Sequence, residues 1–142
     1  MGSKKTLIKI LPIIPLILWI SSCNNCNKQS AINEFKTDAW WGLLRPDTIW
    51  FPTENEMNIK SAESVSKEYS CDFIAYGKKS GTYSGFKLKT TIKCTPYGWL
   101  GVKDEFCLKN SFGWRISDSI LIKKLNNTPP SQFIPIKRDW EK

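Results

Sequence analysis

The sequence predicts a small α+β domain in which one amphipathic helix packs on an antiparallel sheet of three or four strands. Two periods support this: apolar residues recur every three or four positions over about 54–76, and apolar and polar residues then alternate over much of 83–124. A helix with one apolar stripe and a sheet with one apolar face bury each other, so the two segments should form a single core.

The helix is expected over about 54–76. Thr53 can cap the first turn, Glu56 completes a capping box three residues later, and Gly77 suits the C-terminal cap. An apolar stripe lies between these signals: Ile59, Ala62, Val65, Ser66, Tyr69, Phe73 and Tyr76. A competing interpretation ends the helix near Ser70 and starts a strand at Cys71, which would make the chain mainly β.

The strands are expected to form an antiparallel meander over about 83–124. The first strand carries lysines on one face and an apolar set on the other: Phe86, Leu88, Thr90, Ile92 and Cys94. Thr95-Pro96-Tyr97-Gly98 predicts a turn into a second strand, with Leu100, Val102, Phe106 and Leu108 on one face. A second turn near 110–113 leads to a third strand at Trp114 and Ile116, which resumes through Ile120 and Ile122.

Aromatic residues dominate the segments on either side of this core. Trp40, Trp41 and Trp50 lie in an aromatic-rich leader over 35–51, where they either cover the core, the preferred interpretation, or present a binding face. After residue 126, prolines exclude a helix and indicate an extended arm that buries Phe133 and Ile136 or offers Trp140 to a partner.

The N-terminus has the organisation of an export signal. Lys4, Lys5 and Lys9 accompany an apolar stretch that is shorter than the roughly 20 residues of a membrane-spanning helix. The residues that follow, Ile20-Ser21-Ser22-Cys23, resemble the lipobox of bacterial lipoprotein precursors. That resemblance implies cleavage after Ser22 and a diacylglycerol anchor on Cys23, with palmitate-type acyl chains, at the cell membrane or the outer membrane.

The expected organisation is therefore a lipoprotein signal peptide over 1–22, a polar tether over 23–34, a globular domain over 35–125 and a C-terminal arm over 126–142. The mature chain would keep 18 basic and 13 acidic residues, a net charge of +5. This balance suits contact with anionic envelope components, although the lysines are scattered and indicate ordinary solubility as well. A nucleic-acid partner is not expected for an exported protein.

Four cysteines remain after Cys23, and an exported protein would keep them in an oxidising compartment. Cys26, Cys71, Cys94 and Cys107 allow three pairings, which the sequence alone does not separate. Strand parity argues against Cys94 with Cys107 and favours Cys71 with Cys94. A cysteine metal site is not expected, because paired Cys-x-x-Cys knuckles are missing from the sequence.

Catalysis is not expected. The sequence contains no histidine, which excludes a Ser-His-Asp triad and a Cys-His pair. Asp104 and Glu105 are adjacent and would point to opposite faces of a strand, so with Asp118 they make a poor carboxylate dyad. No motif for a cofactor is present.

The run Phe112-Gly113-Trp114-Arg115-Ile116 resembles the closing hairpin of NTF2-like domains, which implies a pocket between a helix and a curved sheet. The function expected is that of a lipid-anchored envelope lipoprotein, acting without catalysis as a binding or structural module for a protein, a glycan or a small apolar ligand. The alternatives are a periplasmic inhibitor of the immunity type and a small NTF2-like domain built around a pocket.

Overall fold

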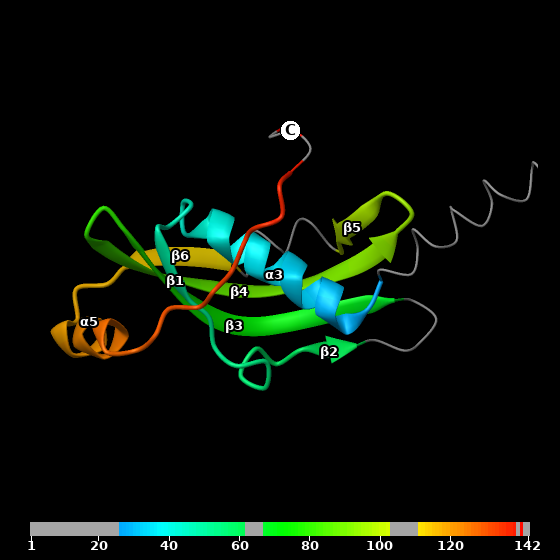
Figure 1. The fold of residues 1–142 in the computed structure, drawn as a ribbon. Coiled ribbons are helices and arrows are strands. Elements are labelled where there is room, and N and C mark those ends of the chain that lie inside the picture. Colours follow the sequence, from blue (N-terminus) through cyan, green and yellow to red (C-terminus); the bar gives the residue numbers. More distant parts are fainter. Residues whose placement is uncertain (1–25, 62–66, 103–110, 139, 141–142) are drawn as a thin grey trace, which may run out of the picture.

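The computed structural model describes residues 26–61, 67–102, 111–138 and 140. In these ranges two helices accompany one antiparallel sheet of six strands, so the predicted α+β class is confirmed, with strand the larger part (Figure 1). Along the chain the elements are α3 (Lys28–Gly42), β1 (Thr48–Trp50), β2 (Lys60–Ser61), β3 (Glu68–Lys79), β4 (Thr82–Thr95), β5 (Gly98–Gly101), β6 (Ser111–Arg115) and α5 (Ser119–Asn126).

The centre of the sheet is the long hairpin of β3 and β4. Its strands pair without interruption from Lys79 opposite Thr82 to Glu68 opposite Lys93. Ser80 and Gly81, the two residues of the connection, both have positive φ, as the type I′ hairpin turn requires. The alternation predicted for the first strand is confirmed, because its apolar set lies on the face toward α3 and its lysines on the other.

Short strands line both outer edges of this hairpin. β1 and β2 pair with opposite ends of β3, while β5 and β6 pair with opposite ends of β4. The expected meander is therefore wrong in its last step: β6 returns to the edge of β4 instead of pairing with β5. Between the stretches of β4 that β5 and β6 cover lie Lys89, Thr90 and Thr91.

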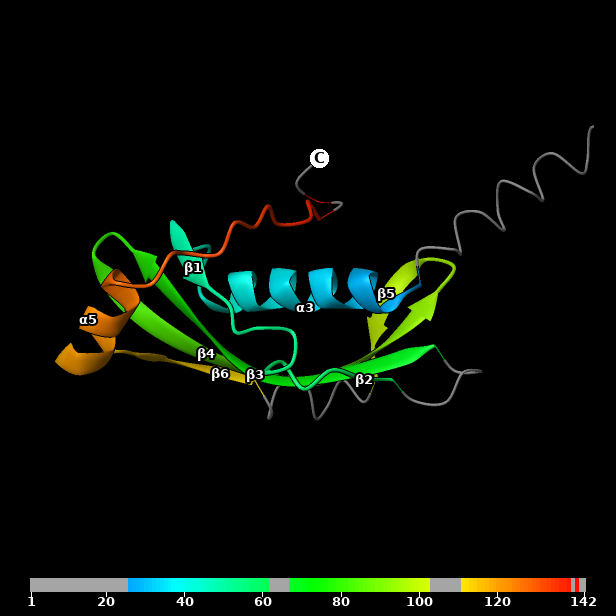
Figure 2. The same ribbon diagram turned by 60° about the horizontal axis from the view of Figure 1, so that its bottom comes forward.

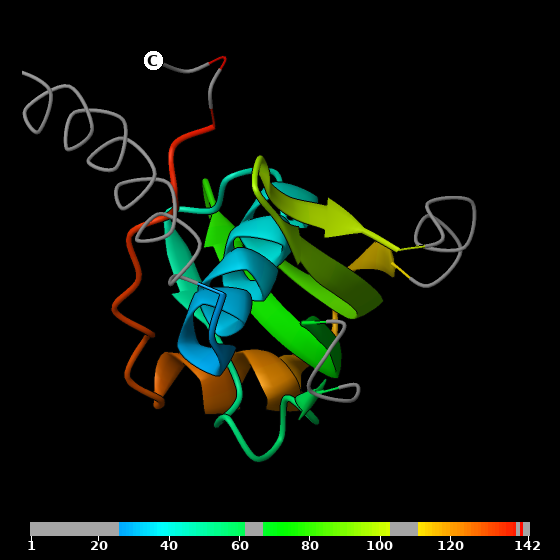
Figure 3. The same cartoon turned by 90° about the vertical axis from the view of Figure 1, so that its right-hand side faces the viewer.

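α3 lies in the hollow of the curved sheet, as Figures 2 and 3 show. Its Ile32 and Phe35 are almost completely buried against Phe73 and Leu88 at the centre of the main core. At its C-terminal end the helix approaches β4 so closely that a Cβ on Gly42 would lie 2.3 Å from the Phe86 ring. Glycine is therefore the residue that lets the helix end rest on the sheet.

A second, smaller core lies on the opposite face of the sheet. Trp50 and Tyr83 stack there with ring centroids 6.3 Å apart, and α5 adds Leu125. Asp118 caps α5 by accepting a hydrogen bond from the amide of Ile120 at 2.9 Å. The predicted third strand is confirmed at Trp114, whereas its continuation through Ile120 and Ile122 is wrong because those residues belong to α5.

The helix predicted over 54–76 is wrong. The capping box does form, since the amide of Thr53 donates to Glu56 at 3.3 Å and the amide of Glu56 to Thr53 at 3.4 Å. A turn and the short strand β2 follow it in the described residues, and β3 begins at Glu68, so the competing strand was correct in type and starts before Cys71. Pairing along β4 satisfies the backbone of this segment and overrides the helical pattern.

Two smaller expectations also need correction. The polar tether over 23–34 is too long, because α3 begins at Lys28 and Asn27 caps it by accepting from the amide of Ser30 at 2.8 Å. The turn expected near 110–113 is wrong over its described part, where Ser111, Phe112 and Gly113 belong to β6.

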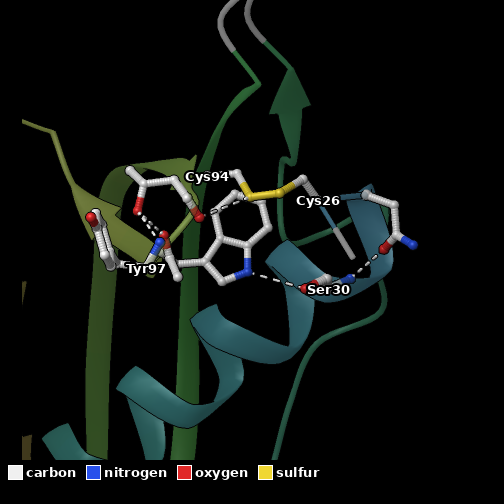
Figure 4. Close-up of a disulfide and its surroundings, with 8 residues drawn as sticks. Cys26, Ser30, Cys94 and Tyr97 are labelled. Atoms are coloured by element: carbon white, nitrogen blue, oxygen red, sulfur yellow. Dashed lines mark hydrogen bonds between the residues drawn. A yellow bond between two sulfur atoms is a disulfide. The ribbon is translucent and has the colours of Figure 1, made fainter. Parts of the chain in front are cut away.

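The disulfide joins Cys26, just before α3, to Cys94 on β4, with Cα atoms 5.7 Å apart (Figure 4). The preferred pairing of Cys71 with Cys94 is therefore wrong: Cys71 is a free thiol buried in the main core, and burial raises its pKa to about 12. Cys107 lies outside the described residues. Beside the disulfide the indole of Trp99 donates to the Ser30 hydroxyl at 3.1 Å, so two contacts hold the start of α3 to β4 and β5.

We expect Cys94→Ser in the chain over 23–142 to lower the free energy of unfolding by about 4 kcal/mol, the loop-entropy estimate for cysteines 68 residues apart. Urea unfolding without reductant measures this loss. Cys71→Ala is the matched control, and its cost should be only about 1 kcal/mol. Peptide mapping that found Cys71 in the disulfide would contradict the pairing.

Candidate functional site

A cavity of about 360 Å³ lies between α3 and the inner face of β4. Phe86, Leu88, Thr90 and Ile92 form its wall on β4, because side chains two residues apart on a strand share a face. β5 contributes Trp99 and Gly101, and β6 contributes Ser111. The volume is near the lower end of the range for small-molecule sites, so the cavity is the best candidate for a binding site.

The cavity coincides with the interval between β5 and β6. β5 covers β4 from Ile92 to Thr95, and β6 covers it from Ser84 to Leu88. Thr90 lines the cavity from the stretch between these two pairings. The cavity therefore lies beside the stretch of β4 between these two pairings, on the side that faces α3.

Three charged side chains lie on the helix side of the cavity. Glu34 and Asp38 are one helical turn apart on α3, and Arg138 reaches them from the C-terminal arm. The guanidinium donates from Nη1 to Oε1 of Glu34 at 2.7 Å and from Nη2 to Oδ1 of Asp38. We call these three residues the charged cluster.

Burial changes the acidity of the cluster. It raises the pKa of Asp38 from 3.8 to about 6; the charge of Glu34 adds to the rise, and Arg138 opposes it. Burial favours the neutral carboxyl, and one guanidinium shared between two carboxylates does not offset that effect. Burial lowers the pKa of Arg138, but the charges of Glu34 and Asp38 raise it by more, so the guanidinium stays charged.

The arm that carries Arg138 is tied down along its length. The amide of Ser131 donates to the carbonyl of Ile49 at 2.8 Å, and Phe133 packs edge-on against Phe51 with centroids 5.3 Å apart. Farther along, the arm crosses α3 (Figure 1), where the amide of Ile136 donates to the Thr37 hydroxyl at 3.4 Å. Phe133 of the expected arm is partly buried against the main core, whereas Ile136 is 46% exposed instead of buried.

The tryptophans singled out in the sequence do not gather at the cavity. Trp50 is buried in the second core, and Trp40 packs against the main core, as the core-cover interpretation predicts. Trp140 is 76% exposed and lies against Trp41, with ring centroids 6.3 Å apart. The indole nitrogen of Trp41 is buried without a hydrogen-bond partner in the described part of the chain.

Among the described residues, Asp118 is the remaining catalytic candidate, and it does not line the cavity. Asp118 caps α5, and its carboxylate is used there. Ser22, Cys23, Asp104 and Glu105 lie outside the described residues. Across the described ranges, no group of three or more His, Cys, Asp or Glu side chains is arranged to hold a metal ion, and no helix is long and apolar enough to cross a membrane.

The sequence patterns did not identify Glu34, Asp38 or Arg138 as site residues. The available signal was the i, i+4 spacing of the two acids, which places both on one face only if residues 28–42 are helical. No protein-family model, curated protein or solved structure matches the chain. The cavity and the charged cluster must therefore be interpreted from their own geometry.

A pH-dependent stability term is expected from Asp38. The pKa of Asp38 is about 6 in the folded protein, compared with an ordinary value of 3.8, so the folded state binds this proton more tightly than the unfolded state. The contribution of Asp38 to the free energy of unfolding therefore rises as the pH falls from above 6 toward 4. Asp38→Asn should therefore gain stability relative to wild type at about pH 8, and the difference should shrink at about pH 5.

Urea unfolding at the two pH values measures this difference. Glu54→Gln, which changes an exposed acid before β2, is the matched control and should show no such trend. A stability difference for Asp38→Asn that does not vary with pH would contradict the raised pKa.

Proposed function

We propose that the chain is an exported lipoprotein, held at the cell envelope by a lipid on Cys23, whose folded domain is a non-enzymatic binding module. The observation that carries this proposal is the disulfide between Cys26 and Cys94. Disulfides persist in oxidising compartments outside the cytosol. The first cysteine of this disulfide, Cys26, lies three residues after the lipobox cysteine. A disulfide in the folded domain is therefore consistent with the export that the signal predicts.

The same disulfide supports close attachment to the membrane. Only Asn24 and Asn25 separate Cys23 from Cys26, and the three intervening steps of chain span at most about 10 Å. The folded domain would therefore stand directly at the lipid headgroups instead of on a long tether.

The cavity supports the binding part of the proposal. It combines an apolar wall on β4 with a few polar groups, which is the usual composition of a small-ligand pocket. It also lies between a helix and a curved sheet, the position implied by the resemblance to NTF2-like domains. The charged cluster favours binding over catalysis, because Arg138 bonds both carboxylates and the sequence has no histidine to share a proton with them.

An inhibitor of the immunity type is the second candidate, and one surface favours it. Phe112 and Trp114 lie together on the outer face of the sheet with ring centroids 5.6 Å apart, and they are 55% and 36% exposed. Exposed aromatic side chains are common in protein-binding surfaces. Capture of a stoichiometric enzyme by the mature chain, with loss of capture in Phe112→Ser, would favour inhibition over a module for small ligands.

The anchor is tested by the intact mass of protein extracted from bacterial membranes. We expect wild type to lack residues 1–22 and to carry an acyl mass, and Cys23→Ala to carry none. Cys26→Ser is the matched control, because it removes the next cysteine and should leave the lipid in place. A wild-type chain that kept residues 1–22 without acylation would overturn the proposal.

A further inference from the structure

The charge around the cavity is unbalanced. Of the described residues that line it, α3 supplies the two carboxylates, the arm supplies one guanidinium, and β4, β5 and β6 supply no charged group. Lys87 and Lys89 belong to β4 but alternate onto the opposite face of the sheet. With both acids ionised, the described part of the lining therefore carries one more negative charge than positive.

The carboxylates also keep free acceptor capacity. Arg138 occupies one oxygen of each acid, Oε1 of Glu34 and Oδ1 of Asp38. Within the described ranges, no donor is recorded for Oε2 of Glu34 or Oδ2 of Asp38. The Glu34 side chain is only 12% exposed and that of Asp38 34%, so water access to these atoms is reduced. The raised pKa of Asp38 agrees with a site that is short of positive charge.

The rest of the cavity is suited to a hydrocarbon body. Phe86, Leu88 and Ile92 present apolar side chains from β4, and Trp99 closes one side from β5. Burial of a ligand against them is favourable at about 25 cal/mol per Å² of apolar surface. An aromatic ring also attracts cations, so Trp99 favours positive charge as well as apolar contact.

We propose that the cavity binds a small amphipathic cation, a primary amine whose ammonium group bonds Glu34 and Asp38 while its apolar body lies against β4 and Trp99. An ammonium group has three donors and no acceptor, which matches the two remaining carboxylate oxygens. An anion would meet two carboxylates. A bare divalent cation would need more oxygen ligands than the lining offers and would leave the apolar wall unused. This inference rests on the proposed function as a binding module.

The test compares three probes that share a phenylalkyl body: phenylbutylamine, phenylbutanol and phenylbutyrate. Binding is measured by calorimetry at neutral pH, with the mature lipidated chain in nanodiscs of zwitterionic lipid and with empty nanodiscs subtracted. We expect the amine, which is protonated at this pH, to bind about tenfold tighter than the alcohol, because it adds charge-assisted hydrogen bonds. Phenylbutyrate should bind more weakly than the alcohol.

Two kinds of variant locate the site. Glu34→Gln and Asp38→Asn each remove one charge and should lower the amine affinity about tenfold while leaving the alcohol nearly unchanged. Glu54→Gln, an exposed change at the other edge of the sheet, is the matched control and should change neither. Ser111→Phe, which places a ring in the cavity, should weaken the amine and the alcohol alike.

Any of the following results would overturn the inference of a cationic ligand in this cavity. Equal affinities for the amine and the alcohol, or a preference for phenylbutyrate, would refute the cationic ligand. Binding that Ser111→Phe leaves intact would place the ligand elsewhere, and no binding of any probe would refute the site. The acyl mass on Cys23 is measured separately, so failure of this inference is distinguishable from failure of the lipoprotein proposal.

Discussion

The constraint on which this fold depends is the need to cover the concave apolar face of the β3–β4 hairpin. α3 covers it and is fixed at both ends. At its N-terminal end the Cys26–Cys94 disulfide and the Trp99–Ser30 hydrogen bond hold it to β4 and β5, and at its C-terminal end Gly42 rests on Phe86. A straight helix over a curved sheet meets it closely only in places, so the cavity beside β4 follows from this geometry.

The sequence correctly predicted β4, the strand whose apolar residues fit only one period. From Phe86 to Cys94, β4 alternates a mainly apolar set with a set of three lysines and one threonine, and no helical stripe competes with that pattern. β3 was missed because its residues fit two periods: Tyr69, Phe73 and Tyr76 recur at helical spacing, whereas Tyr69, Cys71, Phe73 and Ala75 alternate. The choice between them depends on a paired strand that local sequence does not contain.

The candidate site was not predicted from the sequence, for a different reason. α3 begins among polar residues, and two of its members, Glu34 and Thr37, are polar yet buried. A pattern based on apolar residues passes over such a helix. Glu34 is tolerated there because Arg138 compensates its charge, and that partner lies 104 residues away in the sequence. The same long-range contact defines the charged cluster. Neither α3 nor the candidate site was predicted, because both depend on this contact between Glu34 and Arg138.

The disulfide connects the proposed export of the protein with the shape of its cavity. Trp99 forms part of the cavity wall and also donates to Ser30, in the first turn of α3 and four residues after Cys26. Without the covalent bond, the first turn of α3 would be held to β5 by that single hydrogen bond, worth about 1 kcal/mol net. Oxidation after export would therefore fix the wall of the cavity as well as stabilise the chain. Under the proposed function, the cavity wall would therefore be fixed only in the compartment to which the proposed lipid anchor directs the protein.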